Sequence, residues 1–403
     1  MNSGNKTYIY YYLAALAGFV VTFSMVIYPE NAFQAAVTGL DVWWRVVFPA
    51  LLPFFIAAEL LMGLGVVHFM GVLLEPMMRP LFKVPGTGSF VMAVGLASGF
   101  PIGSILTARL RRQNLCSKEE GERLMSFTNT ADPLFMFGAV AVGMLAFPQI
   151  GYTIAAAHYL SSLTVGLLMR FHKPDAPPSS HSNGSKQFIL TRASQELIKA
   201  RQSDDRPFGK VMGDAVRNSV NSLLLIGGFI IAFSVMIEIF NVSGVAGLFS
   251  AATRMPQELV MLITNGILEV SLGCQQAANS SLALGGKIIA TSAIIAWSGL
   301  SVHGQVASII SDTDLDIRPY LVARVIHALL AGFYTAILFD LNLAPAFSDW
   351  LPNFAALSLG ARYLLSTRYL AVILGLWVGA GILTTVSVFF SRVRVKAFKV
   401  NQF

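Results

Sequence analysis

Long apolar runs are the feature that most limits how this chain folds. Several of them, each about 20 residues long, lie at 8–27, 46–66, 127–147, 222–240 and 369–390. A helix of that length crosses the roughly 30 Å of hydrocarbon in a bilayer. Only 12% of the 403 residues are charged, about half the usual share of a soluble domain. The sequence therefore predicts an all-α polytopic membrane protein.

The basic residues alternate between loops in a way that predicts an orientation. The formal net charge is +7, and 23 of the 28 lysines and arginines fall on one side if residues 1–6 are cytoplasmic. Membrane proteins carry this bias on their cytoplasmic side, so the basic excess indicates topology and not nucleic-acid binding. We expect a multi-pass protein of the cell membrane with both termini in the cytoplasm and with its first apolar run retained as an anchor.

Two apolar stretches have to enter and leave on the same side for this topology to hold. Residues 88–108 and 259–282 are both interrupted by small and polar residues. Glycine and proline weaken a helix, and lipid cannot satisfy the backbone groups that are then exposed. We therefore expect two re-entrant helical hairpins with tips at 98–104 and 273–279. The alternatives are a kinked continuous helix and a packing surface of small residues.

The order of spans and hairpins predicts two copies of one unit in opposite orientation, an arrangement typical of secondary transporters. The fold expected is about eight transmembrane helices plus two re-entrant hairpins in an inverted-repeat architecture. The expected segments are an N-terminal helix with an outer amphipathic piece (1–45), a first repeat (46–170), a cytoplasmic linker (171–216), a second repeat (217–340), and an outer piece, last helix and basic tail (341–403).

Polar side chains at the tips and in the spans after them are candidates for contact with a substrate. Such a group costs about 3 kcal/mol within a membrane, so it faces protein or a water path. Hydrogen bonding between helices is the alternative role. The candidates are Ser98, Gly99, Ile102, Gly103, Ser104, Asn129, Thr130, Gly273, Gln275, Gln276, Ser298, Ser301 and Gln305.

Three titratable residues are candidates for coupling or charge sensing. Asp132 either faces the substrate path or caps a turn near the membrane edge. An unpaired carboxylate at Glu269 would be protonated, or matched by a transported ion or Lys287. His303 either changes charge near neutral pH or is a neutral hydrogen-bonded side chain. Candidates for the inner mouth of the path are Arg324 and His327.

No motif indicates enzymatic catalysis. The sequence has no Walker-type phosphate loop, no Gly-x-Ser-x-Gly and no His-Glu-x-x-His. The six histidines lack metal-ligand spacing, and a disulfide between Cys116 and Cys274 is not expected. We expect no catalytic residue, cofactor or metal.

Four segments carry a resemblance to a known family. They are 47–55, with its two prolines, 95–104, 128–133 and 298–305. Through them the whole chain resembles the YlbJ (SpoVV) family of sporulation integral membrane proteins. It resembles more loosely the nucleoside-recognition (Gate) domains and the concentrative nucleoside transporters, whose hairpins and broken helices bind substrate at mid-membrane.

The resemblance implies a carrier that moves dipicolinic acid across the outer forespore membrane toward the developing spore. Helix N-termini at the hairpin tips suit the carboxylates of this dianion. The partners expected are this small anion and the lipid bilayer, with a homo-oligomer left open. The alternatives are a nucleoside or nucleobase carrier, and a non-transporting scaffold of a spore-envelope complex that docks through the 171–216 loop.

Overall fold

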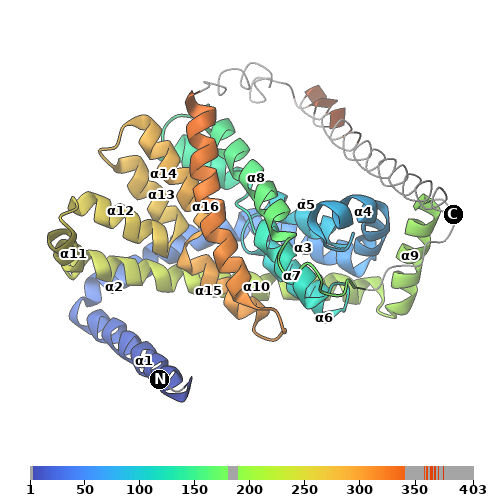
Figure 1. Cartoon of the computed structure of the whole chain (residues 1–403), viewed down its shortest axis with the longest axis horizontal. Coiled ribbons are helices and arrows are strands. Elements are labelled where there is room, and N and C mark those ends of the chain that lie inside the picture. Colours follow the sequence, from blue (N-terminus) through green and yellow to red (C-terminus); the bar gives the residue numbers. More distant parts are fainter. Residues whose placement is uncertain are drawn as a thin grey trace, which may run out of the picture.

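The computed structural model describes residues 3–179 and 189–340, with a few isolated positions between 358 and 375. Within these residues the chain is built from helices and contains no strand, which confirms the expected all-α class (Figure 1). Apart from the isolated positions, the segment 341–403 lies outside the described residues, so its span and basic tail stay predictions.

The helical elements follow one another with short connections. In chain order they are α1 (Ser3–Ile27), α2 (Pro29–Val42), the π-helix η1 (Trp43–Val47), α3 (Phe48–Gly63), α4 (Val66–Phe82), α5 (Gly88–Ser98), α6 (Ile102–Arg112), α7 (Lys118–Thr128), the π-helix η2 (Leu134–Met144), α8 (Ile150–Met169), α9 (Ile189–Ser203), α10 (Phe208–Val242), α11 (Val245–Thr253), α12 (Gln257–Leu268), α13 (Val270–Asn279), α14 (Leu284–Trp297), α15 (Gly299–Ile310) and α16 (Ile317–Asp340).

Four helical segments of the described residues are long and apolar enough to cross a membrane. They are α8, α10, the stretch from α14 through α15, and α16. Two further pairs qualify if each is counted as one bent span, α1 with α2 at 104° and α3 with α4 at 82°. The described residues therefore hold four to six candidate spans, against about eight expected for the whole chain.

Two of the expected spans are interrupted helices. Residues 129–133 separate α7 from η2, so the apolar run at 127–147 is not one helix. Ser298 and Gly299, with φ values of 70° and 78°, lie between α14 and α15. Residues in left-handed or extended conformation end the helical hydrogen-bond ladder. The length of an apolar run in the sequence therefore does not reveal where the helix is interrupted.

The first helix pair that folds back on itself consists of α5 and α6. Gly99, with φ 77°, ends α5, and a side chain there would be strained. The Thr87 hydroxyl at the start of the pair donates to the carbonyl of Leu115 beyond its end, at 3.3 Å. Both ends of this pair thus lie together, and its break faces away from them.

The second such pair consists of α12 and α13. Glu269 separates the two helices in extended conformation, with φ −148° and ψ 137°. At the other end the Ser281 hydroxyl donates to Glu258 at 2.8 Å. The sequence predicted the tip at 273–279, and this was wrong, because the break between the two helices lies at Glu269. Gly273 packs against Gly266 of α12 instead. Small residues that permit close helix contact look in sequence like those that form a turn.

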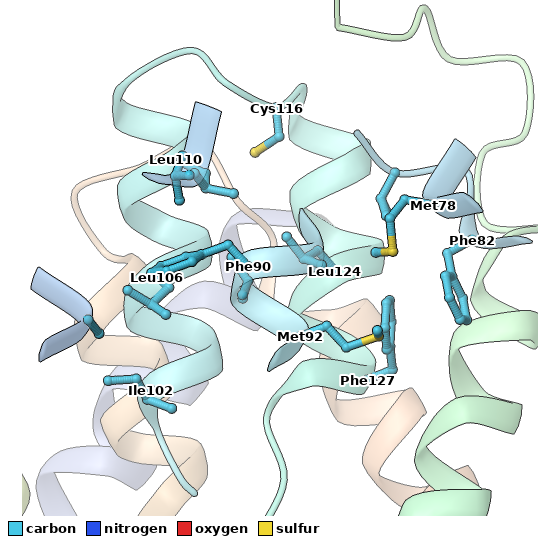
Figure 2. Close-up of a cluster of buried hydrophobic side chains, with 14 of the residues drawn as sticks. Met78, Phe82, Phe90, Met92, Ile102, Leu106, Leu110, Cys116, Leu124 and Phe127 are labelled. Atoms are coloured by element: carbon cyan, nitrogen blue, oxygen red, sulfur yellow. The ribbon is translucent and has the colours of Figure 1, made fainter. Parts of the chain in front are cut away.

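A cluster of buried apolar side chains joins α4, α5, α6 and α7 (Figure 2). In Figure 2 Leu106 of α6 lies beside Phe90 of α5, and Met92 of α5 lies beside Phe127 of α7. The rings of Phe82 and Phe127 stack with their centroids 4.7 Å apart. The cluster fixes the first helix pair against α7.

Polar contacts join the basic loops of both halves at one end of the molecule. Arg111, in the last turn of α6, donates to both carboxylate oxygens of Asp314, before α16, at 2.7 and 3.0 Å. This bonding lowers the pKa of Asp314. The fully buried carboxylate of Glu122 lies 2.8 Å from His172 and 3.2 Å from Lys173. Within the described residues, the loops that these contacts join therefore lie at one end of the molecule, and the side of the membrane that this end faces stays a prediction.

We expect Gly103→Ala to lower the free energy of unfolding by about 1–3 kcal/mol, the usual cost of overpacking. A Cβ at Gly103 would overlap the backbone of Thr128 at the end of α7. The measurement is thermal or denaturant unfolding of the purified protein in detergent. Gly228→Ala is the matched control, because a Cβ there meets nothing within 4 Å. Equal unfolding of the two variants would contradict the packing.

Candidate functional site

A cavity of about 390 Å³ lies where the two helix pairs meet the interrupted helices. We call it the central cavity. Phe100 from the tip of the first pair and Glu269 from the tip of the second both line it, together with residues of η1, α3, α10, α13, α15 and η2. The lining is mainly apolar with a few polar groups, which is typical of small-molecule sites. The polar lining groups are Asp132, Glu269, Ser271, Ser301 and Gln305.

Both acidic residues of the central cavity start a helix. Asp132 Oδ1 accepts a hydrogen bond from the Phe135 amide of η2 at 2.9 Å. Glu269 Oε2 accepts one from the Leu272 amide of α13 at 2.8 Å. Neither carboxylate forms an ion pair within the described residues. Asp132 therefore accepts a hydrogen bond at the start of η2 and also lines the cavity, and its part in a substrate path stays a prediction.

A second cavity, also about 390 Å³, lies between α2, α10 and the α12–α13 pair. We call it the amide chamber, because side-chain carboxamides dominate its polar lining. It shares Val47, Ile230, Glu269 and Ser271 with the central cavity. The two cavities are thus neighbours separated by the tip of the second helix pair. The carboxamides are those of Asn31, Gln34, Asn241, Asn265, Gln275 and Gln276.

The guanidinium of Arg324, on α16, is fully buried between the interrupted helices. Its Nη1 donates to the Asn129 carbonyl at 2.7 Å and lies 3.5 Å from the Ala296 carbonyl, and its Nη2 donates to the Ser126 carbonyl. These carbonyls stand at the ends of α7 and α14, where acceptors lack helical partners and the dipole is negative. In the described part of the chain, helix ends and not a carboxylate hold this charge.

Other side chains complete the backbone hydrogen bonds of the first break. The Asn129 amide nitrogen donates to the hydroxyl of Tyr320 at 2.9 Å. His158 Nε2 accepts from the amide of Ala131 at 3.0 Å, and His327 Nε2 lies 3.0 Å from the carbonyl of His158. The sequence suggested that Arg324 and His327 mark the inner mouth of a substrate path. The structure corrects this, because both side chains are fully buried.

The structure brings six of the sequence candidates to a cavity wall. Four line the central cavity and include both carboxylates. Two others extend from α13 into the lining of the amide chamber. The central cavity has Asp132, Glu269, Ser301 and Gln305, and the amide chamber has Gln275 and Gln276 as well as Glu269.

The other candidates of the first tip pack within protein. The hydroxyls of Ser98 and Ser104 are buried and make no hydrogen bond. Ile102 belongs to the apolar cluster, Gly103 contacts the Thr128 carbonyl, and Gly99 lies against Asp132. None of these five residues lines either cavity.

The remaining candidates, in the breaks and in α13 and α15, make internal contacts. Thr130 donates to the carbonyl of Gly95 at 3.2 Å. Ser298 donates to the carbonyl of Trp297 at 2.5 Å, and His303 Nε2 lies 2.9 Å from the same carbonyl. Asn129 contacts Tyr320, and Gly273 packs on Gly266. These contacts match the alternative role of bonding between helices.

Sequence reasoning missed the amide chamber wall formed by α2 and α10. Ser234, Glu238 and Asn241 recur at helical spacing within the apolar second half of α10, and Asn31 and Gln34 are three residues apart on α2. This spacing places each group on one helix face. The polar spacing on each helix was visible in the sequence. Only the packing of α2 on α10 shows that the two polar faces line one cavity.

The structure also bears on metal binding. Among the described residues no three His, Cys, Asp or Glu side chains come together as a metal-binding group. Cys116 and Cys274 are buried as separate free thiols.

We expect Arg324→Met to lower the free energy of unfolding by about 3 kcal/mol, because two buried carbonyls lose their donor. Unfolding of the purified protein in detergent measures it. Arg318→Met on the same helix is the control, because Arg318 is exposed and pairs only with Asp316, a kind of contact worth under about 1 kcal/mol. Similar losses in both variants would contradict the role assigned to Arg324.

Comparison with known proteins places the chain in a family. The family model described as Gate, nucleoside recognition, matches residues 44–164, which include the first helix pair. An uncharacterized protein of Alkalihalophilus pseudofirmus is 29% identical over 150 residues, 36% of this chain and 31% of that protein. No solved structure matches. The sporulation integral membrane protein YlbJ of Bacillus subtilis (strain 168) is 44% identical over 338 residues, 82% of each chain. The chain therefore belongs to the YlbJ family of sporulation integral membrane proteins.

Proposed function

We propose that this integral membrane protein is a carrier for a small organic acid, with the central cavity as its substrate site. The observation that carries the proposal is the meeting of both helix-pair tips and an interrupted helix around one cavity of about 390 Å³. Non-helical backbone at membrane depth is tolerated where it is buried in protein or lines a cavity, and interrupted segments mark the binding sites of many carriers.

An inverted repeat is the architecture that suits this role. Each helix pair is followed by an interrupted helix, α5–α6 by α7–η2 and α12–α13 by α14–α15. The open end of the first pair lies among the basic loops, near Leu115 and Arg111. We infer two units in opposite orientation, eight spans in the whole chain, and both termini in the cytoplasm. Rocking of one unit against the other would then alternate access to the cavity.

Dipicolinic acid, moved across the outer forespore membrane, is the substrate we propose. Membership of a sporulation family supports it, and the size of the central cavity admits a single-ring dicarboxylic acid. The helix-tip amides of Ile102, Ser104 and Leu272 already have acceptors within the protein. Recognition therefore falls to the side chains of Gln305, Ser301 and Ser271.

Charge sets a condition on this substrate. Within the described residues no lysine, arginine or histidine lines the central cavity, whereas Asp132 and Glu269 do. Four like charges in a low-dielectric cavity repel strongly. The dicarboxylate therefore enters with protons or other cations that neutralise it.

A nucleoside or nucleobase carrier is the second candidate. The match of residues 44–164 to a nucleoside-recognition family favours it. The third candidate, a scaffold that docks through 171–216, has less free surface than the sequence suggests, because α9 in this linker packs against α4.

Purified protein in vesicles is expected to take up labelled dipicolinate above the level of protein-free vesicles. Excess unlabelled dipicolinate should compete, and excess uridine should not. Competition by uridine alone would favour the nucleoside carrier. No uptake of either solute, with deletion of 171–216 abolishing spore formation, would favour the scaffold.

Gln305→Leu is expected to reduce dipicolinate uptake about tenfold or more. A hydrogen bond to a charged group is worth about 1.5–3 kcal/mol, and 1.4 kcal/mol corresponds to tenfold. Leucine keeps the approximate volume of this buried side chain and removes its amide. The control is Gln257→Leu at the exposed start of α12, which should retain uptake. Full uptake by the folded Gln305 variant would exclude it from the site.

A further inference from the structure

Two carboxamide oxygens in the lining of the amide chamber are buried without a hydrogen-bond partner. The Oδ1 atoms of Asn265 and Asn241 have no hydrogen-bond partner, and Asn265 is only 5% exposed. Glu238 accepts a hydrogen bond from the Asn31 amide at 3.1 Å, and Glu269 accepts one or more from the start of α13, Leu272 included. A buried acceptor without a partner costs about 1–3 kcal/mol, so the two unpartnered oxygens favour an occupant that supplies positive charge or donors.

The acidic lining of the chamber also favours a positively charged occupant. Glu238 and Glu269 both line it, and within residues 3–179 and 189–340 no lysine, arginine or histidine does. Acidic groups within a membrane protein usually pair or mark the path of an ion. Oxygens from carboxylates, carboxamides and hydroxyls are the ligands that hard cations prefer in proteins.

The size of the chamber determines the form of the cation. A cavity of about 390 Å³ is much larger than a bare ion, since one water molecule takes up about 30 Å³. Carboxamide oxygens can accept hydrogen bonds from the water shell of an ion. The geometry therefore suits an ion that keeps part of its water shell.

We propose that the amide chamber binds a partly hydrated inorganic cation, with Glu269 as the group that both cavities share. Glu269 and Ser271 line the amide chamber on one side and the central cavity on the other. A cation beside Glu269 offsets negative charge next to the substrate site. The inference rests on the proposed carrier function only for its role in coupling, because the site itself is defined by the chamber.

The test is a cation titration of the full-length protein in detergent, followed by its thermal unfolding midpoint. Sodium, potassium, magnesium and calcium chlorides are each compared with choline chloride at constant ionic strength. At least one inorganic cation is expected to raise the midpoint in a saturable way, since a ligand of the native state stabilises it. The four salts identify which cation the chamber prefers.

Variants assign the effect to the chamber. Glu269→Gln keeps the side-chain shape and removes the charge, and it should abolish the cation-dependent rise. Gln275→Leu should raise the cation concentration for half effect about tenfold, and it serves as the second test if the first variant does not fold. Glu258→Gln makes the same charge change in the same helix pair, outside both cavities, and should respond as the unchanged protein does.

Two results would overturn the cation site. One is the absence of any inorganic cation effect beyond that of choline. The other is an unchanged response in both Glu269→Gln and Gln275→Leu. The titration contains no organic solute, so it decides the cation site whatever dipicolinate uptake shows.

Discussion

The buried guanidinium of Arg324 is the contact on which the interior of the molecule depends. A helix interrupted within an apolar layer leaves carbonyl groups that lipid cannot satisfy. Arg324 donates to carbonyls at the end of α7, and it also approaches the end of α14. The negative ends of two helix dipoles compensate a charge that would otherwise be costly to bury. One residue of α16 thus connects both interrupted helices, which belong to different halves of the chain.

The two breaks in turn position the tips of the helix pairs. Gly99 lies against Asp132 in the first break, and Gly299 of the second break lies against the backbone of Glu269. Each tip therefore meets the break that follows it in sequence, and both carboxylates reach one cavity. A side chain at either glycine would push the tip away from its break. Both cavities border backbone that is not helical, and neighbouring helices hold that backbone in place.

Sequence patterns predicted the parts of this structure that depend on local chemistry. The apolar runs at 8–27 and 222–240 fall within the helices α1 and α10, whereas the run at 127–147 is broken, and small and polar residues identified both folded-back pairs. They did not identify the tip at Glu269, because glycines such as Gly273 serve close helix packing as readily as turns. Nor did they predict the role of Arg324, whose partners are backbone carbonyls more than 20 positions away in sequence. Backbone acceptors carry no sequence signature.

The site was predicted in the same uneven way. Asp132, Glu269 and Gln305 lie at a cavity because polar groups within apolar helices have few other places to go. Asn129 is also a polar residue within an apolar stretch, but its side-chain amide donates a hydrogen bond to the hydroxyl of Tyr320 and does not line a cavity. Composition cannot separate these cases, since each group differs only in what packs beside it. Charge separates them more clearly. In the described chain the Arg324 guanidinium is compensated by helix ends, whereas the cavity carboxylates of Asp132 and Glu269 form no ion pair. The unbalanced charge thus lies at the cavities, where a solute and its ions have access.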